Sequence, residues 1–234
     1  MNPDKTFEIP IVAGDGVGPE LMEAALPCME AITAITGAKV SFKSYPIGYA
    51  ACQEAGTPLP GETMQAIGTA AATLLGGLSV KQCPPPSPTG RMRRELGLFA
   101  DIRQCFSLPG SPRKDVDLVI VRECSEGFLS DRNMFAGSGE FMPTPDVVTS
   151  VRKITTLGSR RVAEFAFQLA AKRRRKVTAI GKEHVLKLTD GLFMGEARKI
   201  AAQCPDIEFG EMDVDAFAAS IYSRPAQFDV ILIT

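Results

Sequence analysis

The sequence predicts an α/β fold with a mixed, largely parallel sheet, and three observations support this prediction. Short runs of β-branched and aliphatic residues alternate along the chain with stretches whose apolar residues recur at helical spacing. Some of these runs, such as LVIV at 118–121, are continuously apolar, which is typical of strands buried in a parallel sheet. The chain has 234 residues, 45% of them apolar, enough for one large α/β domain or two smaller ones.

In the first half of the chain, apolar runs end at turn-forming residues and helical patterns follow them. The run FEIPIVA stops at Gly14, and a helical period begins at Leu21. Residues 82–90 (QCPPPSPTG) are too rich in proline for regular structure, so we expect a loop there. The predicted strands are residues 7–13, 39–44, 72–75, 98–103 and 116–122, and the predicted helices are residues 21–32, 64–71 and 91–96.

The second half opens with residues 126–148, which carry glycines, prolines and aromatics without a helical period. We expect a loop or a β-hairpin arm there. A helix beginning at Ser159 ends in the basic run 172–176, whose cations we assign to the helix C-terminus rather than to nucleic acid. The predicted strands after it are residues 177–180, 207–212 and 229–233, and the predicted helices are residues 185–202 and 215–222.

Charge and composition exclude several function classes. The net charge of −1 gives no bias toward nucleic acid or an anionic membrane, and no apolar run reaches the roughly 18 residues of a spanning helix. The N-terminus lacks the basic segment of a signal peptide, and the six cysteines form no C-x-x-C motif, so we expect a cytoplasmic protein with reduced thiols. A single histidine, His184, excludes a site built from several histidines.

The glycine-rich segment GDGVGPE at 14–20 follows a predicted strand and opens a helix, as a dinucleotide-binding loop would. Its glycines fall at G-x-G-x-G, whereas the dinucleotide fingerprint needs G-x-G-x-x-G, and no strand-end acidic residue follows about 20 residues later. The alternative is a tight turn with Pro19 in the first helical turn, where the missing N–H costs nothing. We favour the turn.

Four segments in order resemble the isocitrate/isopropylmalate dehydrogenase family. GDGVGPE is similar to that family's GDGIGPE, RMRRELGLFADIR to LRRELDLYANLR, RECSEG to RENTEG, and GKEHVLKLTDG to HKANVLKLSDG. The resemblance implies a two-domain fold in which residues 1–98 are the N-terminal part of the large domain. Residues 99–234 would be the small domain, with a dimerisation arm at about 128–148. About two thirds of a family member is covered, so we expect the C-terminal part of the large domain to be lacking.

The resemblance implies a substrate site built on arginines. Arg93, Arg103 and Arg122 match the arginines that hold a malate-type 2-hydroxyacid, a role for which bidentate guanidinium groups suit carboxylates. Ser87 lies where the family distinguishes substrates, and a polar residue there fits an isocitrate-like or tartrate-like substituent. The alternatives are that the arginines only solubilise the surface and that Ser87 only forms a turn.

The resemblance also implies proton-transfer, cofactor and metal residues. Lys182 matches the lysine that helps deprotonate the substrate hydroxyl, a role that burial and neighbouring cations favour by lowering its pKa. His184 replaces an asparagine that helps place the nicotinamide of NAD or NADP. Asp215 matches the first of three aspartates that bind Mg²⁺ or Mn²⁺, hard cations that prefer carboxylate oxygen. The alternative for Asp215 or its neighbour Asp213 is a helix cap.

Two departures weigh against full activity. Leu129 stands where the family has the tyrosine that protonates the enolate, and the other two metal aspartates lie beyond Thr234 in the family pattern. The sequence therefore predicts an NAD(P)- and metal-dependent decarboxylating dehydrogenase that acts on isocitrate, isopropylmalate, homoisocitrate or tartrate. We expect a homodimer that binds a small polycarboxylate, and neither nucleic acid nor membrane. The alternative is a non-catalytic, regulatory or remnant, family member that retains anion binding and dimerisation.

Overall fold

The computed structural model describes residues 6–79, 87–128, 134–137 and 139–234. The chain divides into two compact units, Met1–Gly97 and Leu98–Thr234. The boundary expected from the sequence lies one residue beyond this division. The structure does not assign these units to the family's large and small domains, so that assignment stays a prediction.

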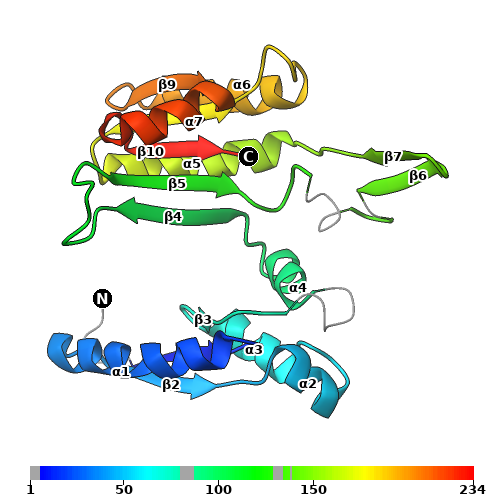
Figure 1. The fold of residues 1–234 in the computed structure, drawn as a ribbon, viewed down its shortest axis with the longest axis vertical. Helices are drawn as coiled ribbons and strands as arrows, with labels where there is room; N and C mark the ends of the chain where they lie inside the picture. The colour runs from blue at the N-terminus through cyan, green and yellow to red at the C-terminus, as the bar shows by residue number, and fades with distance from the viewer. Residues whose placement is uncertain (1–5, 80–86, 129–133, 138) are drawn as a thin grey trace. The chain divides into compact units, whose positions relative to one another are not determined.

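Unit 1 is built on the strand β1 (Phe7–Val12), which lies at the centre of a parallel three-stranded sheet in the order β2-β1-β3 (Figure 1). The flanking strands are β2 (Val40–Ser44) and β3 (Leu74–Leu75). The helices are α1 (Gly18–Thr36), α2 (Gly48–Ala55), α3 (Gly61–Thr69) and α4 (Pro88–Glu95). A small core joins β1, the start of α2, α3 and α4, and its buried members are Val12, Ile47, Leu59, Ile67 and Met92.

The expectation of a loop over residues 82–90 is wrong for its last three residues. Helix α4 begins at Pro88, because a proline is tolerated in the first turn of a helix, where its missing N–H has no intrahelical partner. Ser87 caps this helix, since its Oγ accepts a hydrogen bond from the Gly90 N–H at 3.1 Å. Residues 82–86 lie outside the described residues.

Unit 2 contains a five-stranded sheet in the order β4-β5-β10-β8-β9. All neighbouring strands are parallel except β4, which is antiparallel to β5, so the predicted mixed, largely parallel sheet is confirmed. The strands are β4 (Ala100–Phe106), β5 (Asp117–Glu123), β8 (Lys176–Gly181), β9 (Glu208–Asp213) and β10 (Val230–Ile233).

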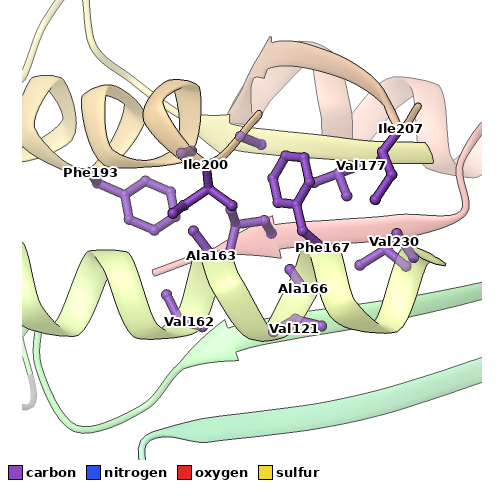
Figure 2. Packing of buried hydrophobic residues seen from close by; sticks show 14 of the residues in the cluster. Val121, Val162, Ala163, Ala166, Phe167, Val177, Phe193, Ile200, Ile207 and Val230 are labelled. Atoms are coloured by element: carbon purple, nitrogen blue, oxygen red, sulfur yellow. The ribbon is translucent and has the colours of Figure 1, made fainter. Parts of the chain in front are cut away.

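Helices cover both faces of this sheet, and the strand residues alternate between them. Val119 and Val121 of β5 pack with α5 (Thr156–Ala171) and α6 (Thr189–Gln203) in the main core. Leu118 and Ile120 point to the opposite face, where Phe217 of α7 (Val214–Ser223) lies. Figure 2 shows side chains of α5, including Phe167 and Ala166, enclosed between the sheet and α6. Burying one such phenylalanine contributes about 2–3 kcal/mol.

Two other segments differ from their predicted bounds. The helix expected over residues 185–202 begins at Thr189, because residues 182–188 form turns in which the Lys182 carbonyl accepts from the Val185 and Leu186 N–H groups. Helix α2 was not predicted, since its sequence GYAACQEA is short and its apolar residues are small. A short 3₁₀ helix, η2 (Pro225–Gln227), leads into β10.

The β-hairpin expected within residues 126–148 lies slightly later in the chain. Strands β6 (Glu140–Thr144) and β7 (Val147–Ser150) pair antiparallel and extend away from the five-stranded sheet (Figure 1). An isolated bridge between Gly127 and Lys153 closes the base of this segment. We call residues 140–150 the arm. Among the described residues, no helix combines the length and apolar character needed to cross a bilayer.

Candidate functional site

The candidate site lies at the carboxyl ends of the parallel strands of unit 2, the edge at which ligands bind in open α/β sheets. Strands β5, β10, β8 and β9 all end there. A pocket of about 340 Å³ opens at this edge. Its charged side chains are three cations and two acids, and the rest of its lining is apolar or glycine apart from Thr234. The charged residues are Arg122, Glu126, Arg152, Lys182 and Asp190.

Arg122 is the penultimate residue of β5 and is exposed at the pocket. No described carboxylate forms an ion pair with it, so its guanidinium is available to a ligand. Arg122 lies directly opposite Asp101 in the antiparallel β4–β5 pair, which places both side chains on the same face of the sheet. This is the α7 face, because Ile120, two residues earlier, packs there.

Arg103 shares that face but does not line the pocket. It lies two residues after Asp101 on β4, and its guanidinium donates to the Asp101 carboxylate at 2.9 Å. The Arg103 side chain is 68% exposed. The structure therefore brings Arg122 and Lys182 to one pocket, and pairs Arg103 with its own strand neighbour.

Lys182 follows the last residue of β8 and forms ion pairs with two aspartates. Its Nζ lies 3.3 Å from an Asp213 carboxylate oxygen and also contacts Asp215. The hydrogen bond with Asp215 raises the pKa of Lys182 above its usual value, although desolvation opposes this. The neighbouring cations that would favour a base role by lowering this pKa are not found here, because the charges nearest to Lys182 among the described residues are anions. Lys182 is held here as an ammonium group.

His184 and Asp215 lie in the same exposed cluster. His184 Nδ1 is 3.2 Å from the Asp213 carboxylate, and its side chain is exposed. Lys182 lowers the pKa of Asp215 through their hydrogen bond. Asp213 is the N-cap of α7 but makes no side-chain capping bond, which disfavours the helix-cap alternative for that residue.

The carboxylates of this cluster do not by themselves form a Mg²⁺ or Mn²⁺ site. Hard divalent cations take about six oxygen ligands. In the part of the chain that the structure describes, no group of three His, Cys, Asp or Glu side chains is placed to share an ion. Asp213 and Asp215 instead neutralise Lys182. The assignment of Asp215 to a metal stays a prediction that needs oxygen ligands from elsewhere.

The sequence did not single out Arg152 and Asp190, which form the most buried ion pair of the pocket. Arg152 precedes α5, and Asp190 lies in the first turn of α6. The guanidinium contacts the Asp190 carboxylate directly. Asp190 belongs to the segment KLTDG, whose resemblance to the family could have drawn attention to it, whereas a lone arginine before a helix gives no such signal.

The two glutamates of RECSEG are buried and shape the loop after β5. Glu123 accepts hydrogen bonds from the Ser125 N–H at 3.0 Å and the Glu126 N–H at 2.7 Å. Glu126 accepts from the backbone N–H and hydroxyl of Thr155, the N-cap of α5. These carboxylates hold the loop beside Arg122 in place. Leu129, two residues beyond Gly127, lies outside the described residues.

Ser87 and Arg93 belong to unit 1, at the two ends of α4. Ser87 caps that helix, as the turn-forming alternative expected, and its place in a substrate site stays a prediction. Arg93 is half-buried in the last turn of α4. Its role in substrate binding likewise stays a prediction.

The glycine-rich loop of unit 1 is a close backbone turn. The Asp15 carboxylate accepts from the Tyr49 N–H at 2.6 Å and the Ser79 N–H at 3.0 Å, which joins three segments. The Asp15 and Gly18 N–H groups donate to backbone carbonyls within unit 1. Because these amides are already used, they cannot cradle a pyrophosphate, which supports the tight-turn interpretation. Pro19 lies in the first turn of α1, as expected.

Unit 2 is thus an α/β unit with a pocket, lined by charged residues of both signs, at the carboxyl edge of its parallel strands, where open α/β sheets bind ligands. The family model described as isocitrate/isopropylmalate dehydrogenase matches residues 8–234. The chain belongs to the isocitrate/isopropylmalate dehydrogenase family.

Relatives with known names agree with this assignment. The 3-isopropylmalate dehydrogenase of Methanothermobacter thermautotrophicus is 39% identical over 233 residues, which are 98% of this chain and 66% of that protein. The regulatory subunit 1 of the NAD isocitrate dehydrogenase of Arabidopsis thaliana is 35% identical over 228 residues, 96% of this chain and 58% of that protein. The isocitrate dehydrogenase structure from Methylococcus capsulatus superposes with a TM-score of 0.84 at 33% identity, covering 98% of this chain and 67% of that one.

Proposed function

We propose that the pocket of unit 2 binds a small polycarboxylate of the malate type, as part of a site for NAD(P)-linked oxidative decarboxylation of a 2-hydroxyacid. One observation carries this proposal: Arg122 and Lys182, which come from separate family-like motifs, line the same pocket. Arg122 has no described carboxylate partner, so it supplies a guanidinium fork for a carboxylate.

The residues in the pocket allow a limited set of chemical roles. Arg122 fixes one substrate carboxylate, and Lys182 adds a second positive charge beside it. While Lys182 is paired with Asp215 it is an ammonium, so it can donate a hydrogen bond or a proton but cannot accept one. A base role for Lys182 requires that this ion pair first be broken. The nicotinamide would accept the hydride in the complete reaction.

A non-catalytic protein is the second candidate, and specific observations favour it. One of the relatives is named as a regulatory subunit, and Leu129 replaces the tyrosine of the family motif. The carboxylates near Lys182 are engaged with that lysine and with His184. Such a protein would keep anion binding at Arg122 and would lack turnover.

Binding and activity experiments separate these candidates. Isothermal titration with isocitrate, 3-isopropylmalate, homoisocitrate and tartrate should detect binding of at least one of them. The variant Arg122→Met should weaken that binding at least about tenfold, because a charge-assisted bidentate contact is lost. The matched control is Arg175→Met, which removes an exposed arginine paired with Asp206 and should leave binding unchanged.

Equal affinities in wild type and Arg122→Met would rule out the proposed site. If binding depends on Arg122, turnover assays with Mn²⁺ and either NAD or NADP then decide between enzyme and non-catalytic protein.

We further propose a homodimer formed through the arm, on the exposed apolar residues of β6 and β7. A cytoplasmic location is proposed from the cysteines, because the five described ones are free thiols.

A further inference from the structure

A buried ion pair forms the floor of the pocket of unit 2. The side chain of Arg152 is 14% exposed and that of Asp190 is 5% exposed. Besides its contact with Asp190, Arg152 donates to the Thr189 hydroxyl at 2.9 Å and to the Thr234 hydroxyl at 2.7 Å. One guanidinium therefore joins the segment before α5, the first turn of α6 and the end of β10.

The second oxygen of Asp190 binds the backbone of Lys182. Arg152 contacts Oδ1, while Oδ2 accepts the Lys182 N–H at 2.6 Å. Because a carboxylate is planar, fixing one oxygen directs the other. The contact with Lys182 therefore depends on the orientation that Arg152 imposes.

The other side-chain contacts of the segment that carries Lys182 lie near the surface. Residues 182–188 form turns, and Val185 and Leu188 are largely exposed. Glu183 pairs with Arg198, Lys182 with Asp213 and Asp215, and His184 with Asp213. These ion pairs are partly exposed, and such pairs contribute little in water. The Asp190 contact is the buried attachment of this segment to the sheet edge.

We propose that Arg152 is a positioning residue: it orients Asp190 so that its carboxylate anchors the Lys182 backbone at the mouth of the pocket. Arg152 also neutralises Asp190, which would otherwise be a buried, unpaired anion beside a ligand carboxylate. The importance of this arrangement for catalysis rests on the proposed function, but the anchoring itself is testable on the unliganded full chain.

The test measures amide hydrogen exchange at Lys182 in the unliganded chain. Arg152→Met keeps the length of the side chain and removes its charge and donors. Asp190 then loses its partner and turns toward water, so exchange at Lys182 should rise at least about tenfold while the amides of β8 change little. The matched control is Arg160→Met, which removes an arginine that binds the buried Glu196 but touches nothing near Lys182.

Two further variants make the outcome decisive. Arg152→Lys keeps one charge but loses the fork, and should give an intermediate exchange rate even if Arg152→Met does not fold. Asp190→Asn should also raise amide exchange at Lys182. If Arg152 served only to neutralise the charge of Asp190, this variant would bind anions more tightly but would leave exchange at Lys182 unchanged. Wild-type exchange at Lys182 in Arg152→Lys and Asp190→Asn would overturn the proposal, as would an equal rise in Arg160→Met. A pocket that binds no polycarboxylate would overturn the proposed function and leave this anchoring intact.

Discussion

At the scale of single residues, the state of Lys182 is set by the carboxylates around it. The family resemblance assigns proton transfer to this lysine, yet both neighbouring aspartates favour its charged form. This ion pair persists at any pH between the pKa of Asp215, which is lowered below 3.8, and the pKa of Lys182, which is raised above 10.5. Its contribution to stability is lost when the pH falls through the pKa of Asp215 and protonates the carboxylate. It is also lost when the pH rises through the pKa of Lys182 and deprotonates the ammonium group.

Replacing Asp215 by asparagine should therefore lower the pKa of Lys182. The largest cause of the raised value is the hydrogen bond with Asp215, and an amide cannot supply its negative charge. Titration of the lysine by NMR, with the Lys182 signal assigned by its own substitution, measures the change. Asp206→Asn, which removes a carboxylate that pairs with Arg175, is the control and should leave the Lys182 titration unchanged. An unchanged pKa in Asp215→Asn would contradict the ion pair.

A second residue-scale prediction concerns the basic run 172–176. We expected these cations to complement a helix C-terminus, and the structure pairs them with specific acids. Arg173 Nε donates to Asp229 at 2.8 Å, and the Arg174 backbone N–H donates to the other oxygen of Asp229. Asp229 is 1% exposed. This pairing joins the end of α5 to the amino end of β10.

Asp229→Asn should lower the free energy of unfolding by about 2 kcal/mol, because the buried charge-assisted contact with Arg173 is weakened, and Arg173 keeps only its partly exposed partner Asp117. Hydrogen exchange of the β10 amides reports that free energy. Asp206→Asn breaks an exposed pair, with both side chains 58% accessible, and should cost less than about 1 kcal/mol. Similar losses in the two variants would show that burial does not govern this network.

The family-like motifs pointed to two residues that line the pocket, but not to the interactions that these residues make. Arg122 and Lys182 could be found because they belong to RECSEG and GKEHVLKLTDG, which resemble family motifs. The pairing of Arg103 with Asp101 depends on a strand register that residue patterns do not specify. Arg152 was missed because its partners lie 37 or more residues away in the chain.

At the scale of elements, hydrophobic periodicity located most strands to within one or two residues. Strands β5 and β8 are examples, since continuous apolar runs have few alternative folds. Helix starts were less predictable, because they depend on local hydrogen bonds. The Ser87 cap starts α4 inside a proline-rich stretch, and turns delay α6 to Thr189. Predicting helix α2 would have required knowing which contacts hold its first turn.

That first turn supplies an element-scale prediction. Gly48 has φ +82°, and a Cβ added there would lie 2.4 Å from an Asp15 carboxylate oxygen. Gly48→Ala should therefore destabilise unit 1 through both backbone strain and a clash with Asp15. Gly56, at the other end of α2, has φ +69° and no atom within 4 Å of an added Cβ. Gly56→Ala should cost only the strain, about 1–2 kcal/mol.

The difference between these two variants isolates the clash, which should add about 1–3 kcal/mol. Amide exchange of β1 measures the stability of unit 1 in each variant. Equal losses in Gly48→Ala and Gly56→Ala would mean that Asp15 moves away at no cost. Such a result would contradict its role in joining three segments through the Tyr49 and Ser79 N–H groups.

At the scale of the whole molecule, the two units differ in how completely they bury their apolar residues. Unit 2 encloses its sheet between helices on both faces. In unit 1 the long helix α1 has only Gly18 and Met22 buried, and Leu21, Ile32 and Ile35 are exposed. Periodicity predicted that helix, but it could not show which of its apolar residues would be covered.

The arm also exposes apolar residues, and this supports the proposed homodimer. A two-stranded hairpin is marginally stable by itself in water, and Phe141, Met142 and Val148 expose much of their surface. Sedimentation velocity should show a dimer for the wild-type chain. The double variant Phe141→Asp/Val148→Asp should raise the dimer dissociation constant at least about tenfold, because it places unpaired carboxylates in an apolar contact. Tyr222→Asp, at an exposed apolar residue of α7, should leave the dimer intact. A monomeric wild type, or an equal effect of Tyr222→Asp, would contradict dimerisation through the arm.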